Sequence, residues 1–330
     1  MQRHAISTCP HLQRVLIFDQ QAVASALPYK LLIDAIAKAF ASDTVTPART
    51  THAIRIPGQA DGTLLLMPAW QEGAKLGVKI AGVFPDNAQR GLASVQASYL
   101  LLDATSGVPL AVLDGAELTL RRTAAASALA SRYLSPESAE TLLIVGTGKL
   151  APHLVEAHAA VRRIKRVLVW GRRPAQALKL SQKLARPGLQ IDIAASLPSA
   201  VAEADIISCA TLSETPLIKG EWLRPGQHLD LVGAFTKRMA EADGDAVARA
   251  QIFVDTFEGA LSEAGELVQA LQAGLIARDA ILADLAMLVR GRHPGRVRES
   301  DITLFKSVGT AIEDLAAARC VMEQSKSKAS

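Results

Sequence analysis

The chain is poor in cysteine, with three residues in 330, and these stand far apart at positions 9, 209 and 320. An odd and dispersed set predicts neither a disulfide framework nor a cysteine-rich metal centre, and it favours a reduced, cytoplasmic compartment. The sequence also lacks any apolar run near the ~18 residues that a membrane span needs. Its first residues, MQRHAISTCPHLQR, contain no apolar stretch, so we expect no secretory signal and no membrane partner.

Aromatic residues are scarce as well, at 4%, and the 36 Lys and Arg residues are scattered among 32 acids. A nucleic-acid groove needs clustered cations and stacking rings, so no nucleic-acid partner is expected. His153 and His158 stand five apart rather than at the i, i+4 spacing of a helical metal pair, which predicts no metal site. Apolar residues nevertheless reach 49%, enough for a sizeable core.

Two patterns divide the chain. Residues 1–120 contain an amphipathic helix over 27–43 and several strand-like segments separated by Gly, Pro, Asn and Asp, which predict a mixed or antiparallel sheet. Between 121 and 304, apolar strands alternate with helices, which indicates a parallel sheet covered on both faces. A strong helix after Gly309 is expected to return to the first domain. The sequence thus predicts an α/β fold: a Rossmann, doubly wound parallel-sheet domain plus a smaller α+β domain.

A glycine motif follows the first apolar strand of the second zone. The segment TLLIVGTGKLA (141–151) places Gly146, Gly148 and Ala151 in a G-x-G-x-x-A pattern between that strand and a helix. In this context Gly146 permits the tight turn, Gly148 lets backbone approach a pyrophosphate, and Ala151 keeps the helix close to the strand. The free N–H groups of the helix start favour the phosphates. The motif predicts dinucleotide binding, against the alternative of an ordinary strand–helix turn.

The next strand, RVLVWGRRP, ends where an NAD site usually carries an acid that binds the ribose 2′-OH. Here Arg172 and Arg173 follow Gly171 instead. Guanidinium groups can pair with a 2′-phosphate, and no carboxylate would repel it. We therefore expect NADP(H) as the preferred cofactor, with NAD(H) possible, unless these arginines merely belong to a solvated loop.

Longer segments show a family resemblance. The chain resembles the ornithine cyclodeaminase/μ-crystallin family, which includes archaeal-type alanine dehydrogenases and cyclic ketimine reductases. The resemblance is carried, in this order, by LLLMPAW (64–70), LGVKIAGVFPDN (76–87), the segment 91–130, LIVGTGKLA (143–151), LDLVGAFT (229–236) and ITLFKSVGTAIEDLA (302–316).

The resemblance implies a split first domain. Residues 1–120, completed by 305–330, would form a substrate-binding and dimerisation domain, and residues 121–304 the Rossmann NAD(P)-binding domain of a homodimer. Arg49, Lys79 and Arg122 match the family positions that hold the substrate carboxylate and the region of the reacting nitrogen. Three cations around one carboxylate can orient it for reaction. Arg55 stands close enough in sequence to substitute for Arg49.

The resemblance also implies a set of cofactor contacts, many of them at the carboxyl ends of the Rossmann strands. These are Ser94, Arg122, Thr123, Gly146, Gly148, Lys149, Leu150, Gly171, Arg172, Thr211, Val232, Gly233 and Ser307.

One departure from the family pattern narrows the activity. Ornithine cyclodeaminases carry an aspartate in the run after Val-Gly, whereas this chain reads Val232-Gly233-Ala234-Phe235. Loss of that acid favours a reductase, and an apolar ring suits a small aliphatic or cyclic substrate. We expect NADPH-dependent reduction of a cyclic ketimine carboxylate, Δ1-pyrroline-2-carboxylate and/or Δ1-piperideine-2-carboxylate, to L-proline or L-pipecolate. Alternatives are alanine-dehydrogenase-like activity, ornithine cyclodeamination and a non-catalytic NADPH-dependent ligand-binding protein.

Overall fold

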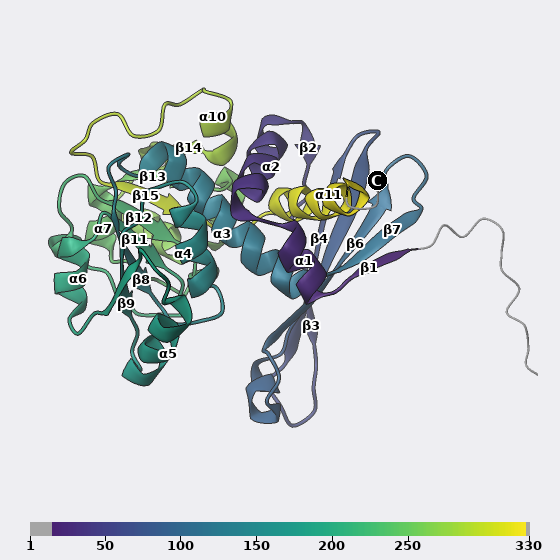
Figure 1. Cartoon of the computed structure of the whole chain (residues 1–330), viewed down its shortest axis with the longest axis horizontal. Helices are drawn as coiled ribbons and strands as arrows, with labels where there is room; N and C mark the ends of the chain where they lie inside the picture. Colours follow the sequence, from purple (N-terminus) through teal and green to yellow (C-terminus); the bar gives the residue numbers. More distant parts are fainter. Residues whose placement is uncertain (1–14, 328–330) are drawn as a thin grey trace, which may run out of the picture.

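Two β-sheets, each with its own helices, form two domains joined by long helices (Figure 1). The structure is a computed structural model and describes residues 15–327. The first sheet has seven strands in the order β1-β7-β6-β5-β4-β2, with β3 paired to β4. Its pairs are antiparallel except for β1 with β7. Its elements are β1 (Leu16–Phe18), α1 (Gln20–Ala26), α2 (Tyr29–Ala41), β2 (Thr44–Val45), β3 (Thr50–Ile54), β4 (Gly62–Gln71), β5 (Lys75–Val83), β6 (Val95–Asp103) and β7 (Pro109–Asp114).

The second sheet is parallel throughout and has eight strands in the order β10-β9-β8-β11-β12-β15-β13-β14. The order reverses direction between β8 and β11, which is the position where doubly wound sheets bind nucleotides. Its elements are β8 (Thr141–Val145), α4 (Ala151–Ala159), β9 (Arg166–Trp170), α5 (Pro174–Leu184), β10 (Gln190–Ile193), α6 (Leu197–Glu203), β11 (Ile206–Cys209), β12 (His228–Leu231), α7 (Gly244–Arg249), β13 (Gln251–Val254), α8 (Phe257–Glu263), α9 (Gly265–Gln272), β14 (Ile281–Asp284), α10 (Leu285–Val289) and β15 (Thr303–Lys306).

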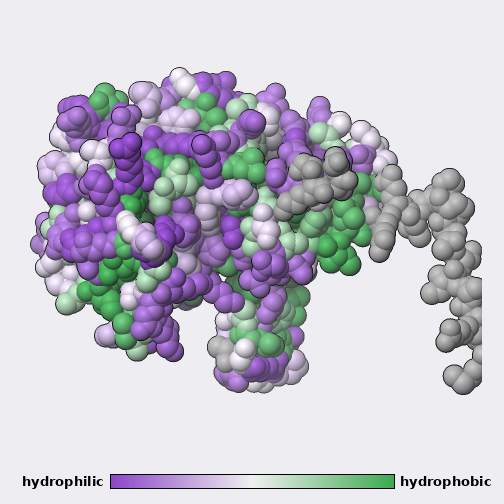
Figure 2. Space-filling view, in the orientation of Figure 1, coloured by the Kyte–Doolittle hydropathy of each residue, from purple (hydrophilic) through white to green (hydrophobic). Residues whose placement is uncertain are grey.

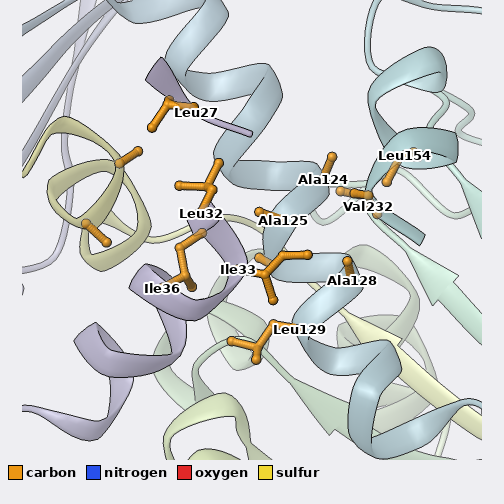
Figure 3. Packing of buried hydrophobic residues seen from close by; sticks show 14 of the residues in the cluster. Leu27, Leu32, Ile33, Ile36, Ala124, Ala125, Ala128, Leu129, Leu154 and Val232 are labelled. Carbon is orange, nitrogen blue, oxygen red and sulfur yellow. The ribbon is translucent and has the colours of Figure 1, made fainter. Parts of the chain in front are cut away.

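Three helices carry the junction between the sheets: α2, α3 (Gly115–Leu134) and α11 (Ala311–Ser327). Helix α3 starts at its N-cap Asp114, whose side chain accepts from the backbone N–H of Glu117 at 2.8 Å. Its alanine-rich centre is fully buried, so α2 and α4 can approach it closely. Figure 3 shows the apolar side chains of α2, such as Leu32 and Ile36, packed beside this alanine face. One core cluster therefore continues through both domains.

The structure confirms the predicted two-sheet α/β organisation, including the helix after Gly309. The expected boundary at residue 304/305 falls inside β15, which pairs with β12 and β13 in the middle of the Rossmann sheet. The chain therefore returns to the first domain only after Lys306. The segment 262–271, whose sequence predicts a single capped helix, is instead divided, because α8 ends at Glu263 and α9 begins at Gly265. Backbone carbonyls of Thr236 and Met239 lie so close to Gly265 that a Cβ there would clash.

The outer face of the first sheet is apolar. Helices α3 and α11 pack against β5 and β6 on the inner face, which buries Lys79, Tyr99 and Leu101. Residues of opposite parity point outward, and among them Ile17 is 82% exposed and Ile80 is 43% exposed. Apolar side chains also gather over this part of the first domain in Figure 2.

Candidate active site

The predicted glycine turn lies at the carboxyl end of β8. Gly146 has a φ of +115°, and a Cβ there would lie 2.6 Å from the carbonyl oxygen of Ala210, so only glycine fits. Above Gly148, by contrast, nothing lies within 4 Å of an added Cβ. Ala151 is fully buried at the start of α4. The turn thus combines a glycine forced by tight packing with an open surface suited to a pyrophosphate.

The end of β9 lies beside this turn, because a Cβ on Gly171 would approach Cγ2 of Thr147 to 2.7 Å. Arg172 and Arg173 follow, and both are exposed. Within residues 15–327, neither guanidinium has a hydrogen-bond or ion-pair partner. The two arginines therefore stand next to the glycine turn with their donors available for an anion.

Two further strand ends meet at this edge of the sheet. Thr211 follows β11 and Gly233 follows β12, and a Cβ on Gly233 would collide with the backbone of Thr211. Glu241 joins them: its Oε1 accepts from the Thr211 backbone N–H at 2.6 Å and hydroxyl at 2.9 Å, and its Oε2 accepts from the Gly233 N–H at 2.7 Å. The three predicted strand-end positions Gly146, Thr211 and Gly233 are thus neighbours.

Arg49 lies in a cleft between the two domains. The cleft is lined by residues 46–49, Met67, α8 and the first residues of α11. Nη2 of Arg49 donates to the carbonyl oxygen of Gly309 at 2.7 Å, and its Nε lies 3.3 Å from Oε1 of Glu263. Arg55, the alternative, lies beyond the end of β3 and is exposed. The structure thus places Arg49, and not Arg55, in the cleft.

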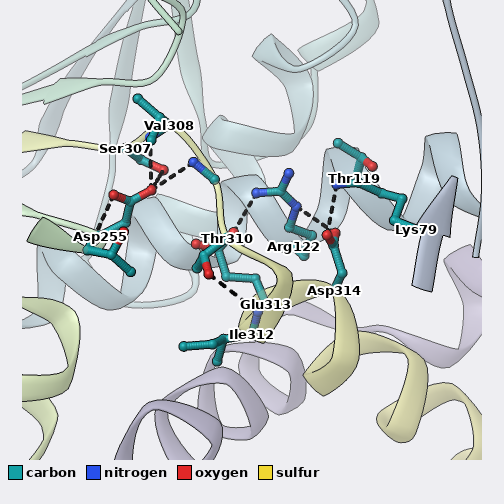
Figure 4. Close-up of polar contacts among 12 residues, drawn as sticks. Lys79, Thr119, Arg122, Asp255, Ser307, Val308, Thr310, Ile312, Glu313 and Asp314 are labelled. Carbon is teal, nitrogen blue, oxygen red and sulfur yellow. Dashed lines mark hydrogen bonds and ion pairs between the residues drawn. The ribbon is translucent and has the colours of Figure 1, made fainter. Parts of the chain in front are cut away.

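Lys79 and Arg122 share one buried carboxylate (Figure 4). Nζ of Lys79 lies 2.8 Å from Oδ2 of Asp314, and Nε of Arg122 lies 3.0 Å from Oδ1. Nη1 of Arg122 donates to Glu313 at 2.5 Å. The same guanidinium leaves no room for a side chain at Gly309, whose carbonyl oxygen binds Arg49. The three predicted cations therefore converge on one segment, residues 309–314.

Burial and charge shift the titration of this cluster in different directions. Burial lowers the pKa of Lys79 to about 8, although Asp314 opposes the shift. Burial raises the pKa of Glu313 to about 7 against the attraction of Arg122. Burial acts to raise the pKa of Asp314 too, but Lys79 and Arg122 outweigh it and hold the pKa below its usual range. Asp314 is thus the permanent anion of the cluster, while Lys79 and Glu313 titrate nearer neutrality.

A second buried acid holds the segment that leads into α11. Oδ2 of Asp255 accepts from the Ser307 hydroxyl at 3.1 Å and from the backbone N–H groups of Val308 and Gly309 at 2.8 and 2.7 Å (Figure 4). Ser307, predicted as a cofactor contact, is itself buried and donates to Asp255. The acid shapes the segment whose carbonyls bind Arg49.

The family can be read from comparison with known proteins. The model of the ornithine cyclodeaminase/mu-crystallin family matches residues 14–329. The chain belongs to the ornithine cyclodeaminase/mu-crystallin family. The Δ(1)-pyrroline-2-carboxylate reductase of Paracoccus denitrificans is 44% identical over 261 residues, which cover 78% of this chain and 82% of the relative.

Solved structures agree. Δ(1)-pyrroline-2-carboxylate reductase of Thermococcus litoralis, in complex with NADH and L-proline, matches with a TM-score of 0.90 and 33% identity over 96% of this chain and 98% of that one. An archaeal alanine dehydrogenase dimer with bound NAD matches with a TM-score of 0.88 and 29% identity over 96% of this chain and 97% of that one. The expected family, Rossmann-type fold and oxidoreductase class are confirmed.

In this family member, the remaining predicted residues differ in their surroundings. Leu150 is the N-cap residue of α4, and Lys149 beside it is exposed. Thr123 and Val232 are buried. Ser94 is exposed in the β5–β6 connection, and no hydrogen bond of the described residues joins its side chain to the other predicted contacts. The contact of Ser94 with the cofactor therefore stays a prediction from the family resemblance.

The sequence prediction missed the buried acids Glu241, Asp255, Glu266, Glu313 and Asp314. Each stands in a segment with many apolar neighbours, such as VDTF or AIEDLA, and that context was the available signal. Phe235, which the family resemblance matches to the cyclodeaminase aspartate, is 42% exposed in the segment that follows β12. Within residues 15–327, no helix is long and apolar enough to cross a membrane. Nor does that part of the chain contain a cluster of three or more His, Cys, Asp or Glu residues suited to a metal ion.

Proposed function

We propose that this protein reduces a cyclic ketimine carboxylate, Δ1-pyrroline-2-carboxylate and/or Δ1-piperideine-2-carboxylate, to L-proline or L-pipecolate with a reduced nicotinamide cofactor. The observation that carries the proposal is the convergence of Arg49, Lys79 and Arg122 on residues 309–314. The glycine turn of β8 fits the diphosphate of such a cofactor, because the space above Gly148 is open. Two relatives named Δ(1)-pyrroline-2-carboxylate reductase support the same activity, and the structure of one of them contains NADH and L-proline.

The cation cluster suits a single carboxylate. Among residues 15–327, Lys79 makes one ion pair, to Asp314, which leaves further N–H bonds of its ammonium for a ligand. Nη2 of Arg122 has no protein acceptor within residues 15–327, so it can also donate to a carboxylate. These donors would hold the carboxylate and thereby orient the adjacent C=N carbon. Bound cofactor supplies the hydride that this carbon receives.

Proton supply to the product nitrogen follows from the same cluster. A protonated imine is already cationic and accepts hydride without a strong acid beside it. Asp314, kept ionised by its two cations, stabilises positive charge near the site, and Lys79 with a pKa of about 8 is mostly protonated at neutral pH. Asp314 thus favours the protonated, reactive imine of the bound ring. Lys79 can supply a proton to the ring nitrogen.

The proposal includes a preference for NADPH over NADH. Arg172 and Arg173 stand beside the glycine turn without protein partners, and the β9 end carries no acid for a ribose 2′-OH. The solved relatives contain NADH or NAD, so this preference would distinguish the chain from them.

It also includes a homodimer formed through the outer face of the first sheet. This face exposes Ile17, Ile80 and Val112. Large exposed apolar patches usually mark surfaces that contact another protein chain. The archaeal relative is described as a dimer, which supports this arrangement.

Purified protein should oxidise NADPH when either cyclic imine is added. The reaction is monitored by the loss of the absorbance of the reduced nicotinamide. Absence of turnover with both ring sizes and both cofactors would reject the proposal. Alanine dehydrogenase activity is the second candidate, because a relative of that name shares the fold at 29% identity. Turnover with pyruvate and ammonium, but not with the imines, would select it.

A further inference from the structure

Three neighbouring strands of the Rossmann sheet end on one buried group of charged residues. Glu241 is fully buried, and its carboxylate receives the N–H of Thr211 after β11, the Thr211 hydroxyl and the N–H of Gly233 after β12. These three donors leave the carboxylate little capacity for any other role. Glu241 therefore fixes the distance between two loops that belong to the proposed cofactor edge.

A second layer fixes Glu241 in turn. Its backbone N–H donates to Oε1 of Glu266 on α9 at 2.9 Å. Oε2 of Glu266 lies 3.2 Å from Nζ of Lys306, the last residue of β15. All three residues are fully or almost fully buried, so we call Glu241, Glu266 and Lys306 the carboxylate network. It connects the carboxyl ends of β11, β12 and β15, which are consecutive strands of the sheet.

We propose that Glu241 is a positioning residue for the nicotinamide cofactor, and that its protonation loosens the Thr211 and Gly233 loops and weakens cofactor binding. The inference rests on the proposed function, because it assumes that the cofactor occupies this edge. Protonation turns one acceptor oxygen into an O–H donor, so the carboxyl can no longer accept from all three groups. A backbone N–H then loses its acceptor in a buried place, and the loop must move to restore one.

The electrostatic surroundings place this protonation near the physiological range. Burial, with a smaller opposite effect from Lys306, raises the pKa of Glu241 to about 6. The charged or titratable groups around it are Glu266 on α9, Lys306 on β15 and Cys209 on β11, whose thiol pKa is raised by burial. Burial keeps the Cys209 thiol protonated, and Lys306 pairs with Glu266, so Glu241 is the buried carboxylate that contacts both loops and has a raised pKa.

The geometry argues for more than structural support. Gly233 touches both the Thr211 backbone and the Glu241 carboxylate so closely that no side chain fits. A small shift of the carboxylate must therefore move both loops together. Thr211 and Leu212 beside it are partly or largely exposed, so the moved surface is one that a ligand can contact.

The test is cofactor affinity as a function of pH, measured on the full chain by the fluorescence of bound NADPH and, separately, NADH. The wild-type dissociation constants of both should rise as pH falls below about 6. NADH is needed because the 2′-phosphate of NADPH titrates in the same range, as phosphomonoesters do near pH ~6. Glu241→Gln should weaken binding roughly 10-fold at neutral pH, since it loses a charged acceptor, and should remove the pH dependence.

Glu241→Asp keeps a titrating carboxylate on a shorter stem, so it should bind with intermediate affinity and retain the pH dependence. Glu221→Gln, at an exposed glutamate of the same domain, is the matched control and should behave as wild type. A Glu241→Gln protein that keeps the wild-type pH profile would overturn the inference while leaving the proposed function standing. Wild type that binds neither nucleotide at neutral pH would reject the cofactor site itself, and the inference with it.

Discussion

Replacing Asp314 by Asn tests the cation cluster most directly. The substitution keeps the size of the side chain and removes the charge that lies 2.8 Å from Lys79 and 3.0 Å from Arg122. Arg122 keeps Glu313 as a partner, but Lys79, with 3% of its surface exposed, loses the one ion pair that it makes within the described range 15–327. Removing one partner of a buried ion pair costs about 3–5 kcal/mol in the free energy of unfolding, because the remaining charge stays buried without compensation. We therefore expect Tm to fall by roughly 5–15 °C.

The pH dependence of this loss has a definite sign. In the wild type, the pKa of Lys79 is about 8 when folded and 10.5 when unfolded. The unfolded chain therefore binds more protons between these values, and the contribution of Lys79 to stability rises with pH across that window. In Asp314→Asn the lysine loses its anion, its pKa falls further, and neutral Lys79 becomes the stable form. The difference in stability between variant and wild type should thus be largest below the lowered lysine pKa of the variant, should shrink as the pH rises toward about 8, and should be constant above that value.

Thermal and urea unfolding at several pH values measure both effects. A double variant, Lys79→Met with Asp314→Leu, is the matched control, because replacing a buried ion pair by apolar residues is often neutral for stability. It should recover most of the lost stability without recovering imine reduction. A loss under ~1 kcal/mol for Asp314→Asn, or one that grows with pH, would refute the account of Lys79 as a buried charge held by Asp314.

Three further changes test other parts of the molecule. Arg172→Ala with Arg173→Ala should lower kcat/KM for NADPH about 10-fold or more and leave that for NADH nearly unchanged, because only a 2′-phosphate needs both guanidinium groups; equal losses for both cofactors would contradict this. Gly146→Val should abolish nucleotide binding in a fluorescence titration, since its Cβ would lie 2.6 Å from the Ala210 carbonyl oxygen; normal affinity would argue against the turn. Ile80→Lys should shift the protein toward monomer in light scattering after size-exclusion chromatography, and an unchanged mass would remove the outer sheet face from the interface.

The elements that were predicted well are those with long periodic patterns. Helix α2 carries Leu32, Ile33, Ile36 and Phe40 on one buried face, and this spacing is visible in the sequence. Strand β1 has three residues and exists because it pairs with β7, more than ninety positions away. Short elements of this kind depend on tertiary contacts, so local patterns do not reveal them.

The site divides in the same way. The glycine turn could be predicted because its backbone conformation is local and requires glycine, which is visible in the sequence. The partners of Lys79 and Arg122 were not predicted, because Glu313 and Asp314 in a helix normally indicate a solvated face, and their apolar neighbours were the one contrary signal. Only the packing of α11 against β5 and α3 turns that face inward and places two acids beside two cations.

Strand β15 has a consequence for how the polypeptide becomes a protein. It comes from residues 303–306 and is inserted between β12 and β13, so the centre of the Rossmann sheet stays incomplete until Lys306 has left the ribosome. Until then β12 and β13 have no strand between them, and their unpaired backbone edges can form incorrect strand pairs. Assembly of the nucleotide domain is therefore a late, long-range event. A nascent chain stalled before Thr303 should bind chaperones and should not bind the cofactor.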